Sequence, residues 1–366
     1  MTGAVPASAY AGRRDRLVSE LQLDSEPLDA VLITDLVNIR YLTGFTGSSG
    51  ALLISPSQTV FATDSRYDGQ SARQCPDLER IIERPCADAL LARAVSSGVV
   101  RVGFESSHVT VATHTTWLHG FPTASLIGRT ELVEIGRVVK DEWEVALLRR
   151  ACAISDDALA ALLPDVVCGM TERDVARRLE SYLFDRGADA LSFETIVAAG
   201  ENSAIPHHSP TDRALRTGDL LKIDFGAEFG GYHADMTRTF CLGSPAPWQV
   251  EIYDVVREAQ EVGRAAVRAG ADVSSVDAVA RGFIQAAGFG EDFGHGLGHG
   301  VGLEIHEAPT LGPLGTGILA PGTPVTVEPG VYLEGRGGVR IEDTLLVTDG
   351  APESLTTSER DLVVLG

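Results

Sequence analysis

Lysine is nearly missing from this chain: only Lys140 and Lys222 are present among 366 residues. The 30 basic residues are outnumbered by 51 acidic ones, which gives a formal net charge of -21. The negatively charged backbone of a nucleic acid would be repelled by such a protein. The composition therefore excludes nucleic acid from the expected partners.

Cysteine and long apolar runs are scarce as well. The five cysteines are odd in number, widely spread and without a C-x-x-C pair, which argues against a disulfide framework and against a thiolate zinc site. No apolar run approaches the ~20 residues needed to span a bilayer, and the N-terminal residues lack the basic start and apolar core of a signal peptide. We expect no membrane partner and a cytoplasmic location.

The length and the 44% hydrophobic content are enough for two domains, each with its own core. Residues 1–12 are expected to be a mobile tail. After them, apolar runs such as 30–33 and 51–54 alternate with polar or helical stretches. This alternation predicts a small α/β domain.

A long helical period begins near residues 134–140, where we place the boundary between domains 1–136 and 137–366. Thr171 with Asp174, and Ser274 with Asp277, are expected to cap helices of the second domain. Two helices and then a group of strands, in this order twice, predict an α+β domain with two similar halves. The expected helices are 143–162, 171–187, 250–267 and 274–288, and the expected strands are 193–198, 220–227, 234–242, 325–332 and 339–347.

The strand that contains Asp224 carries Lys222 on the same face, because side chains alternate along a strand. A hairpin turning at Gly230 and Gly231 would bring Asp224 close to Asp235. Two facing carboxylates repel and stay ionised only when a cation or strong donors lie between them, which indicates a metal ion. On these residues alone, a pair of solvent-facing aspartates on an edge hairpin is an equally open alternative.

A glycine-rich run, FGHGLGHGVGLEIHEAP, holds three histidines. Glycine lets the backbone bend sharply and approach its neighbours closely. A lone histidine is more often structural, but three in one such run, with Glu304 and Glu307 beside them, favour a binding or catalytic site.

Two later strand-like segments carry acidic residues among apolar ones: VTVEPG contains Glu328 and GVRIEDTLLV contains Glu342. A buried glutamate needs a partner. For Glu342, an ion pair with Arg340 is the alternative to a metal. Together with Asp224 and Asp235, the two glutamates carry four negative charges, which two divalent ions would neutralise.

Two metal ions ~3.5 to 4 Å apart can share one water and lower its pKa toward ~7, which makes a hydroxide nucleophile at neutral pH. A ligand set dominated by oxygen, with a single nitrogen, suits manganese. Cobalt, zinc and iron stay open as alternatives.

The order of two aspartates, a histidine and two glutamates resembles the creatinase, prolidase and methionine aminopeptidase group, which has the so-called pita-bread fold. The histidine is identified from GHGVGLEIHE, where the second histidine lies seven residues further on. The resemblance implies five ligands for the two metal ions: Asp224, Asp235, His299, Glu328 and Glu342.

The same resemblance implies that His207, in AIPHHSP, and His306, in EIHEAP, line the substrate pocket, with His208 the less favoured neighbour. An imidazole donor near the developing oxyanion binds more strongly as charge builds up. The resemblance also implies that Glu328 takes the proton from the nucleophilic water and that Arg340 orients the ligands.

Tyr232 and His295 are weaker candidates for the pocket or its immediate surroundings. His295 is included among the substrate-binding residues.

The stretches NIRYLTGFTGSSGALLIS and TDSRY, and the join KDEWEVALLRRAC, resemble the proline-specific branch of this group. The resemblance therefore covers nearly the whole chain. It implies a smaller creatinase-type α/β domain before an α+β pita-bread catalytic domain, substrates that are proline-containing peptides, and a homodimer. Methionine aminopeptidases lack such an N-terminal domain, which disfavours them.

Prolidases often carry an arginine four residues after the pocket histidine, where it can pair with the free carboxylate of a dipeptide; here that position is Thr310. We therefore expect an aminopeptidase P-like enzyme that removes the residue before proline from longer peptides. The close alternative is an Xaa-Pro dipeptidase (prolidase) with another cation, such as Arg336, as the anchor. A remote alternative is a metal-free binding module, because some proteins of this fold have lost the metal ligands.

Overall fold

The computed structural model of the chain describes residues 5–23 and 26–366, so the first four residues of the expected mobile tail lie outside the described residues. The chain divides into two compact units, Met1–Arg137 and Val138–Gly366. The sequence placed this boundary one residue earlier. None of the described helices is long and apolar enough to cross a membrane.

The N-terminal unit is built on a mixed six-stranded sheet with the order β4-β3-β2-β1-β5-β6. β1 pairs antiparallel with β2 and parallel with β5. Both β1 and β2 are buried along their whole length, which explains why they are uninterrupted apolar runs. The strands are β1 Ala30–Ile33, β2 Ala51–Ile54, β3 Thr59–Thr63, β4 Glu79–Ile82, β5 Arg101–Glu105 and β6 Ser125–Arg129. The helices are α1 Ala7–Leu23, α2 Leu36–Thr43, α3 Asp68–Gln74, α4 Cys86–Ser96, α5 Val111–Gly120 and α6 Glu134–Val138.

The prediction of a mobile tail is wrong from Ala7 on, because helix α1 begins at this residue. Arg13 and Arg14 are buried and donate to the main-chain oxygens of Tyr41 and Leu42, each at 2.8 Å. These oxygens lie in the last turn of α2, where helix carbonyls lack partners within the helix. The two arginines therefore hold α1 against α2.

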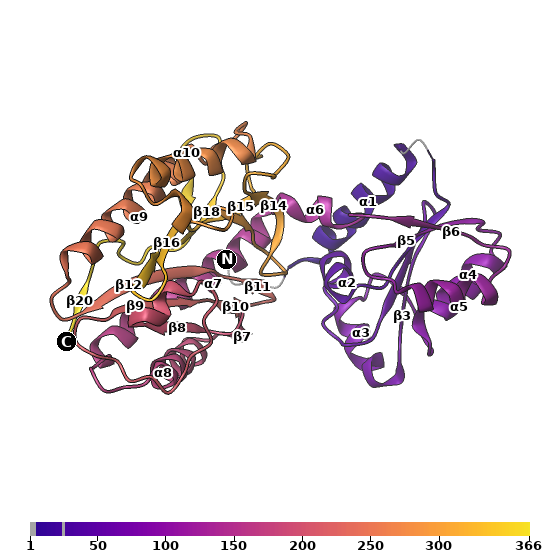
Figure 1. Ribbon diagram of the computed structural model, residues 1–366. Helices are drawn as coiled ribbons and strands as arrows, with labels where there is room; N and C mark the ends of the chain where they lie inside the picture. Colours follow the sequence, from indigo (N-terminus) through magenta and orange to yellow (C-terminus); the bar gives the residue numbers. More distant parts are fainter. Residues whose placement is uncertain (1–4, 24–25) are drawn as a thin grey trace. The chain divides into compact units, whose positions relative to one another are not determined.

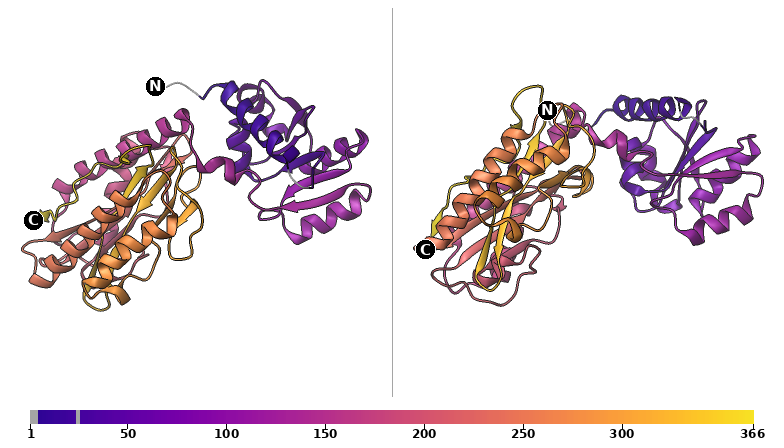
Figure 2. Two further views of the ribbon diagram at one scale, coloured as in Figure 1. Left: turned by 90° about the horizontal axis from the view of Figure 1, so that it is seen from above. Right: turned by 45° about the horizontal axis from the view of Figure 1, so that its top comes forward.

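The C-terminal unit has two pairs of helices with strands between them (Figure 1). α7 and α8 pack on the sheet β20-β12-β9-β8, around a core that includes Ile154 and Ile223. α9 and α10 lie side by side in every view (Figures 1 and 2) and pack on a second sheet, β14-β13-β15-β18-β19, around a core that includes Val276 and Val325. A helix pair on a sheet, twice, confirms the α+β prediction with two similar halves.

Along the C-terminal unit, each helix pair precedes its own group of strands. The helices are α7 Glu142–Leu162, α8 Glu172–Asp185, α9 Pro247–Ala266 and α10 Val273–Ala286. The strands of the first half are β7 Ala190–Leu191, β8 Ile196–Ala199, β9 Leu220–Phe225, β10 Ala227–Phe229, β11 Tyr232–His233 and β12 Met236–Leu242. The later strands are β13 Gly298–Gly300, β14 Glu307–Leu311, β15 Pro324–Val327, β16 Gly330–Leu333, β17 Gly337–Arg340, β18 Asp343–Leu346, β19 Glu353–Ser354 and β20 Val364–Leu365.

One of the two predicted helix caps is confirmed. The capping box of Thr171 and Asp174 is present at the start of α8. The predicted cap of α10 is wrong, because Asp272 rather than Ser274 is the N-cap and accepts a hydrogen bond from the main-chain amide of Ser274. Asp277 is a buried residue inside this helix.

The two long strands predicted at 325–332 and 339–347 are each broken in two. β15 pairs with β18 in the five-stranded sheet, whereas β16 pairs with β17 in a separate ribbon. The breaks fall at Glu328 and Glu342. The apolar alternation continues across both breaks because the strands on either side are largely buried, so it gives no signal of them.

Candidate metal centre

The two aspartates come from the antiparallel pair β9 and β12. Asp224 lies on β9 directly opposite Thr237, and Asp235 comes one residue before β12 begins. β9 lies between β12 and β8, and both aspartates are buried, with 6% and 5% exposure. The alternative of solvent-facing aspartates on an edge hairpin is therefore wrong.

A glycine brings the aspartate segments together. A Cβ atom at Gly226 would lie 1.8 Å from the main-chain oxygen of Ala234, so only glycine fits at this crossing. Gly298 has the same role in the histidine run, where a Cβ atom would lie 2.0 Å from the oxygen of Thr326. Both glycines let a neighbouring strand approach closely beside a candidate ligand.

The two glutamates lie where strands leave one sheet for another. Glu328 follows β15, and Thr326 donates to its Oε1 at 3.2 Å. Glu342 precedes β18, and Thr237 donates to its Oε2 at 2.6 Å. Because each glutamate stands at a break between strands, its side chain reaches the cavity that Asp224 also lines.

His299 lies on β13 with its ring fixed by the main chain. Its Nδ1 is 3.0 Å from the oxygen of Gly300, so the geometry assigns the proton to Nδ1. The free Nε2 then lies 3.3 Å from Oε1 of Glu328 and 3.5 Å from Oδ2 of Asp235. With a cation between Nε2 and these carboxylates, His299 would be neutral and its Nε2 would serve as a ligand atom.

These side chains fit divalent cations. Asp235, His299 and Glu342 each offer one ligand atom, and the three atoms lie within 4.8 Å of one another. Oδ1 of Asp224 and Oε1 of Glu342 are buried without a hydrogen-bond partner among the described residues. A buried carboxylate oxygen without a donor is costly, and a bound cation removes that cost.

The pKa shifts of these side chains also favour a bound cation. Burial and the neighbouring carboxylates raise the pKa of Asp235 and of Glu342 well above the ordinary range. Burial opposes a charge on His299, but Glu328 and Asp235 outweigh it and raise the His299 pKa to about 9. The pKa of Glu328 falls to about 2, because His299 and Arg340 outweigh the effect of its burial. Without a cation, the four carboxylates therefore do not all ionise at neutral pH.

All five predicted ligands line one cavity of about 570 Å³. This volume is in the usual range of small-molecule pockets, about 300–1,000 Å³. The predicted pocket histidines His207, His295 and His306 line the same cavity, and so does His208.

The histidines differ in how they are held. The ring of His306 packs edge-on against His299, with 4.4 Å between centroids. His295 has both ring nitrogens engaged, one with the oxygen of Gly296 at 2.8 Å and one with the hydroxyl of Tyr332 at 2.9 Å. Burial lowers the pKa of both His295 and His306, which favours neutral rings.

Arg340 connects several parts of the site. It is 2% exposed and donates to Oδ2 of Asp224, to the Thr237 hydroxyl at 3.0 Å and to the Tyr332 hydroxyl at 2.9 Å. The alternative ion pair of Arg340 with Glu342 is therefore not formed as a direct contact; the bound carboxylate is that of Asp224.

Two weaker candidates lie elsewhere. Tyr232 donates to Glu144 at 2.9 Å and does not line the cavity. Arg336 stacks over the ring of Trp248, 4.6 Å from its centroid, and is also outside the cavity lining. Arg336 therefore does not line this cavity, and its role as a carboxylate anchor stays a prediction.

Residues that the sequence reasoning passed over are Thr237, which holds Glu342, and Tyr332, which joins His295 to Arg340. Strand alternation already put Thr237 on the same face as Asp235, so that signal was present. Tyr332 had no such signal, because its partner His295 is 37 residues away in the sequence.

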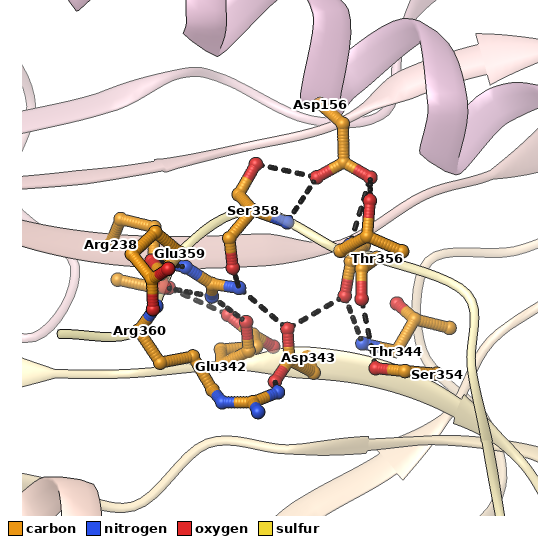
Figure 3. Close-up of polar contacts among 12 residues, drawn as sticks. Asp156, Arg238, Glu342, Asp343, Thr344, Ser354, Thr356, Ser358, Glu359 and Arg360 are labelled. Atoms are coloured by element: carbon orange, nitrogen blue, oxygen red, sulfur yellow. Dashed lines mark hydrogen bonds and ion pairs between the residues drawn. The ribbon is translucent and has the colours of Figure 1, made fainter.

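A buried network fixes the main chain behind Glu342 (Figure 3). Asp343 accepts from Arg238 at 2.7 Å and from Thr356 at 2.9 Å. Arg238 also donates to the main-chain oxygen of Glu342 at 2.5 Å. Burial would raise the pKa of Asp343, but Arg238 and the other nearby arginines lower it below the ordinary value. This carboxylate is ionised and fully partnered, unlike its neighbour in the cavity.

A cavity that brings together four candidate carboxylate ligands, one candidate imidazole ligand and further histidines is the arrangement of a metal-dependent hydrolase. The model of metallopeptidase family M24 matches residues 146–349. The model of the creatinase/prolidase N-terminal domain matches residues 13–139. The chain belongs to metallopeptidase family M24, with a creatinase/prolidase N-terminal domain.

Related proteins agree with this assignment. An Xaa-Pro dipeptidase from Pyrococcus horikoshii is 33% identical over 352 residues, which cover 93% of this chain and 96% of the relative. The solved structure of an Xaa-Pro dipeptidase from Bacillus anthracis has a TM-score of 0.94 at 37% identity and covers 97% of this chain and 100% of its own. The structure of an X-Pro aminopeptidase from Thermotoga maritima has a TM-score of 0.88 at 35% identity, covering 96% and 99%.

The protein is thus a metallo-hydrolase of the proline-peptidase branch, in a family that uses divalent metal ions. This confirms the predicted family and pita-bread fold class. The remote alternative of a metal-free binding module is not supported.

Proposed function

We propose that the protein is an Xaa-Pro dipeptidase, which hydrolyses the bond between a residue and a following C-terminal proline. The observation that carries the proposal is the single cavity in which the five ligand-type side chains lie beside His207 and His306. Two dipeptidases among the relatives favour dipeptide use over the aminopeptidase P-like activity expected from the sequence.

We propose two divalent ions as cofactors. Bound divalent ions lower the pKa of water toward about 7 and polarise the scissile carbonyl. Manganese suits the oxygen-rich ligand set, with cobalt, zinc and iron as alternatives. The residues that would hold them are Asp224, Asp235, His299, Glu328 and Glu342.

The remaining steps belong to side chains of this chain. Glu328, which lines the cavity with its Oε1 3.3 Å from Nε2 of His299, would accept the proton of the attacking water. His207 and His306 donate N–H groups to the carbonyl oxygen of the substrate, and these bonds strengthen as negative charge develops. Arg340 holds Asp224 in place through their buried ion pair.

A second candidate is an Xaa-Pro aminopeptidase acting on longer peptides, and Thr310 favours it. Thr310 lines the cavity at the place where an arginine would bind a dipeptide carboxylate. Arg340, the only arginine among the described lining residues, already pairs with Asp224. A dipeptide carboxylate would therefore depend on the histidine and hydroxyl donors of the lining.

The test follows release of the first residue from a Gly-Pro dipeptide and from an Arg-Pro-Pro-type peptide, side by side, with manganese-loaded enzyme. Preference for the dipeptide supports the proposal. Preference for the longer peptide supports the aminopeptidase instead, and cleavage of neither overturns both.

A matched pair of variants tests the role of position 310. Thr310→Arg should increase kcat/KM for the dipeptide relative to the longer peptide, because it adds a partner for the free carboxylate. Thr310→Gln has a similar length without the charge and should not. An equal ratio of kcat/KM for the dipeptide to kcat/KM for the longer peptide in both variants would show that a charge at position 310 does not determine substrate length.

A homodimer and a cytoplasmic location are proposed together with this function, from resemblance to the proline-specific branch. Sedimentation velocity at micromolar concentration tests the dimer directly.

A further inference from the structure

The two lysines of this chain are both buried. Lys222 is 0% exposed and Lys140 is 5% exposed. Lysine normally keeps its ammonium group in water, and burying it carries a large desolvation penalty. Each buried amino group therefore needs hydrogen-bond partners within the protein.

Lys222 holds the main chain immediately before His207. Its Nζ donates to the oxygen of Ile205 at 2.7 Å and to the oxygen of Pro206 at 3.3 Å. Arg340 donates to the same Pro206 oxygen at 3.2 Å. The segment that carries a candidate substrate histidine is therefore fixed by hydrogen bonds from two basic side chains.

Tyr332 completes the surroundings of this amine. The ring of Tyr332 lies under the ammonium group, with Nζ 5.0 Å from the ring centroid. A ring face attracts a cation, especially one removed from water. Two carbonyls and a ring face thus hold the Lys222 amine in a defined place, while burial and the nearby Arg340 lower its pKa.

Lys140 acts on the segment that carries the other histidine. Its Nζ donates to Oε2 of Glu307 at 2.8 Å, and the two side chains are 1% and 5% exposed. Oε1 of Glu307 accepts from the main-chain amide of Glu304 at 2.9 Å. Glu307 therefore links Lys140 to both sides of His306.

We propose that the two lysines are positioning residues for the two substrate histidines: Lys222 acts through the segment before His207, and Lys140 acts through Glu307 on His306. This rests on the proposed function for the roles of the histidines. A histidine that donates to a developing oxyanion must be placed to within a fraction of an ångström, and small displacements are costly in rate. A buried amine that donates hydrogen bonds to main-chain oxygens or to a carboxylate fixes such a segment more firmly than an apolar side chain of similar size.

A double-mutant cycle tests the proposal. Lys222→Met, which is close in shape, should lower kcat/KM for the dipeptide about tenfold in the wild-type background and less than about twofold in a His207→Ala background. The crossed pair, Lys222→Met with His306→Ala, is the matched control and should remain additive. Lys140→Met should show the reverse pattern, coupling to His306 and not to His207. Equal losses in all backgrounds would overturn the proposal.

Metal content separates this role from an effect on Asp224 or Arg340. The bound manganese per chain should be unchanged in both lysine variants. If Lys222→Met fails to fold, Lys222→Gln keeps a donor for the carbonyls and should retain more activity than the equivalent Lys222→Leu variant. Loss of metal in proportion to activity would contradict a positioning role.

A readout without substrate keeps this inference distinct from the proposed function. Imidazole NMR signals of the metal-free protein can be assigned by their loss in His207→Ala and His306→Ala. Lys222→Met should shift the His207 signals and leave those of His306 in place, and Lys140→Met should do the opposite. Unmoved signals would overturn the inference even in an active enzyme, whereas selective shifts would support it even if no Xaa-Pro substrate is cleaved.

Discussion

Two groups of acidic side chains in the described part of the chain have ligand atoms close enough to share a metal ion. One lies in the N-terminal unit and comprises Asp35, Glu105 and Glu134; the other lies in the C-terminal unit and includes Asp235 and Glu342 with His299. Their distances are alike, but their hydrogen bonds are not. The comparison shows which property of such a group indicates a metal site.

The N-terminal group is satisfied by the protein itself. Oε2 of Glu105 accepts from the amides of Thr34 at 2.6 Å and Asp35 at 2.9 Å. The Asn38 amide donates both to Glu105 and to Glu134, each at 2.8 Å. These carboxylates serve as acceptors that join α2, β5 and α6, so nothing about them requires a cation.

The C-terminal group is left short of donors. Oε1 of Glu342 and Oδ1 of Asp224 have none among the described residues, although both atoms are buried. Burial and like charges raise the pKa of Asp235, but burial also raises the pKa of Glu105, so the direction of these shifts does not separate the two groups. Unsatisfied buried oxygens, more than short distances, distinguish the candidate metal centre.

The largest effect is expected from removing a proposed ligand. Asp224→Ala or Glu328→Gln should lower kcat/KM by at least about 10³-fold, because each removes a charged group at the reaction centre. Steady-state kinetics with metal in excess, and circular dichroism to check the fold, measure this. Near-normal activity in either variant would remove the site assignment.

Removing metal should come next, with an effect on stability as well as activity. A metal that binds only the folded protein at 100 times its Kd adds about 2.7 kcal/mol of stability. Calorimetry after treatment with a chelator should show a lower Tm, recovered on adding manganese. A Tm that does not respond to metal would contradict a cation in the C-terminal unit.

The free energy of unfolding should respond differently in the two groups when one carboxylate is neutralised in the metal-free protein. Glu105→Gln should lower the free energy of unfolding by about 1–3 kcal/mol, since buried donors lose their acceptor. Glu342→Gln should leave it unchanged or raise it, because a repelling charge is removed while the Thr237 bond can be kept.

Denaturant unfolding of the two variants, with bound manganese as a second readout, decides between these outcomes. Glu105→Gln should bind as much manganese as the unmodified protein. A loss of manganese in Glu105→Gln, or destabilisation of the same size in both variants, would contradict the claim that only the C-terminal group needs a cation.

The smallest effect on stability is expected at Glu172, another buried carboxylate. Like Glu105, it accepts hydrogen bonds on both oxygens. Burial raises its pKa, but donors that include Asn202, Thr211 and His208 outweigh burial, so the net pKa is below its ordinary value of 4.5. A depressed pKa contributes stability above the unfolded pKa, and this is lost as pH falls through the folded pKa.

Glu172→Gln should therefore cost about 1–2 kcal/mol at pH 7 and progressively less below about pH 4.5. Urea unfolding of both proteins at pH 7, 5 and 4 measures the difference. A cost that is constant with pH would show that the carboxylate charge is not what matters.

Much of this protein could be predicted from local sequence patterns. The strands at 30–33 and 51–54 and the capping box at Thr171 are present as predicted, since each depends on a few neighbouring residues. The proposed metal ligands were found because their order is distinctive, and the structure brings all of them into one cavity.

The tertiary structure decided which partner each charged group has. Arg340 binds Asp224, 116 residues away, rather than nearby Glu342. The strand break at Glu342 and the buried positions of both lysines also had no sequence signal, whereas Pro329 directly after Glu328 is a signal that the strand ends there. Periodicity reports which face of an element is apolar, but a hydrogen-bond partner depends on how distant segments close around it, and that is set by packing of the whole unit.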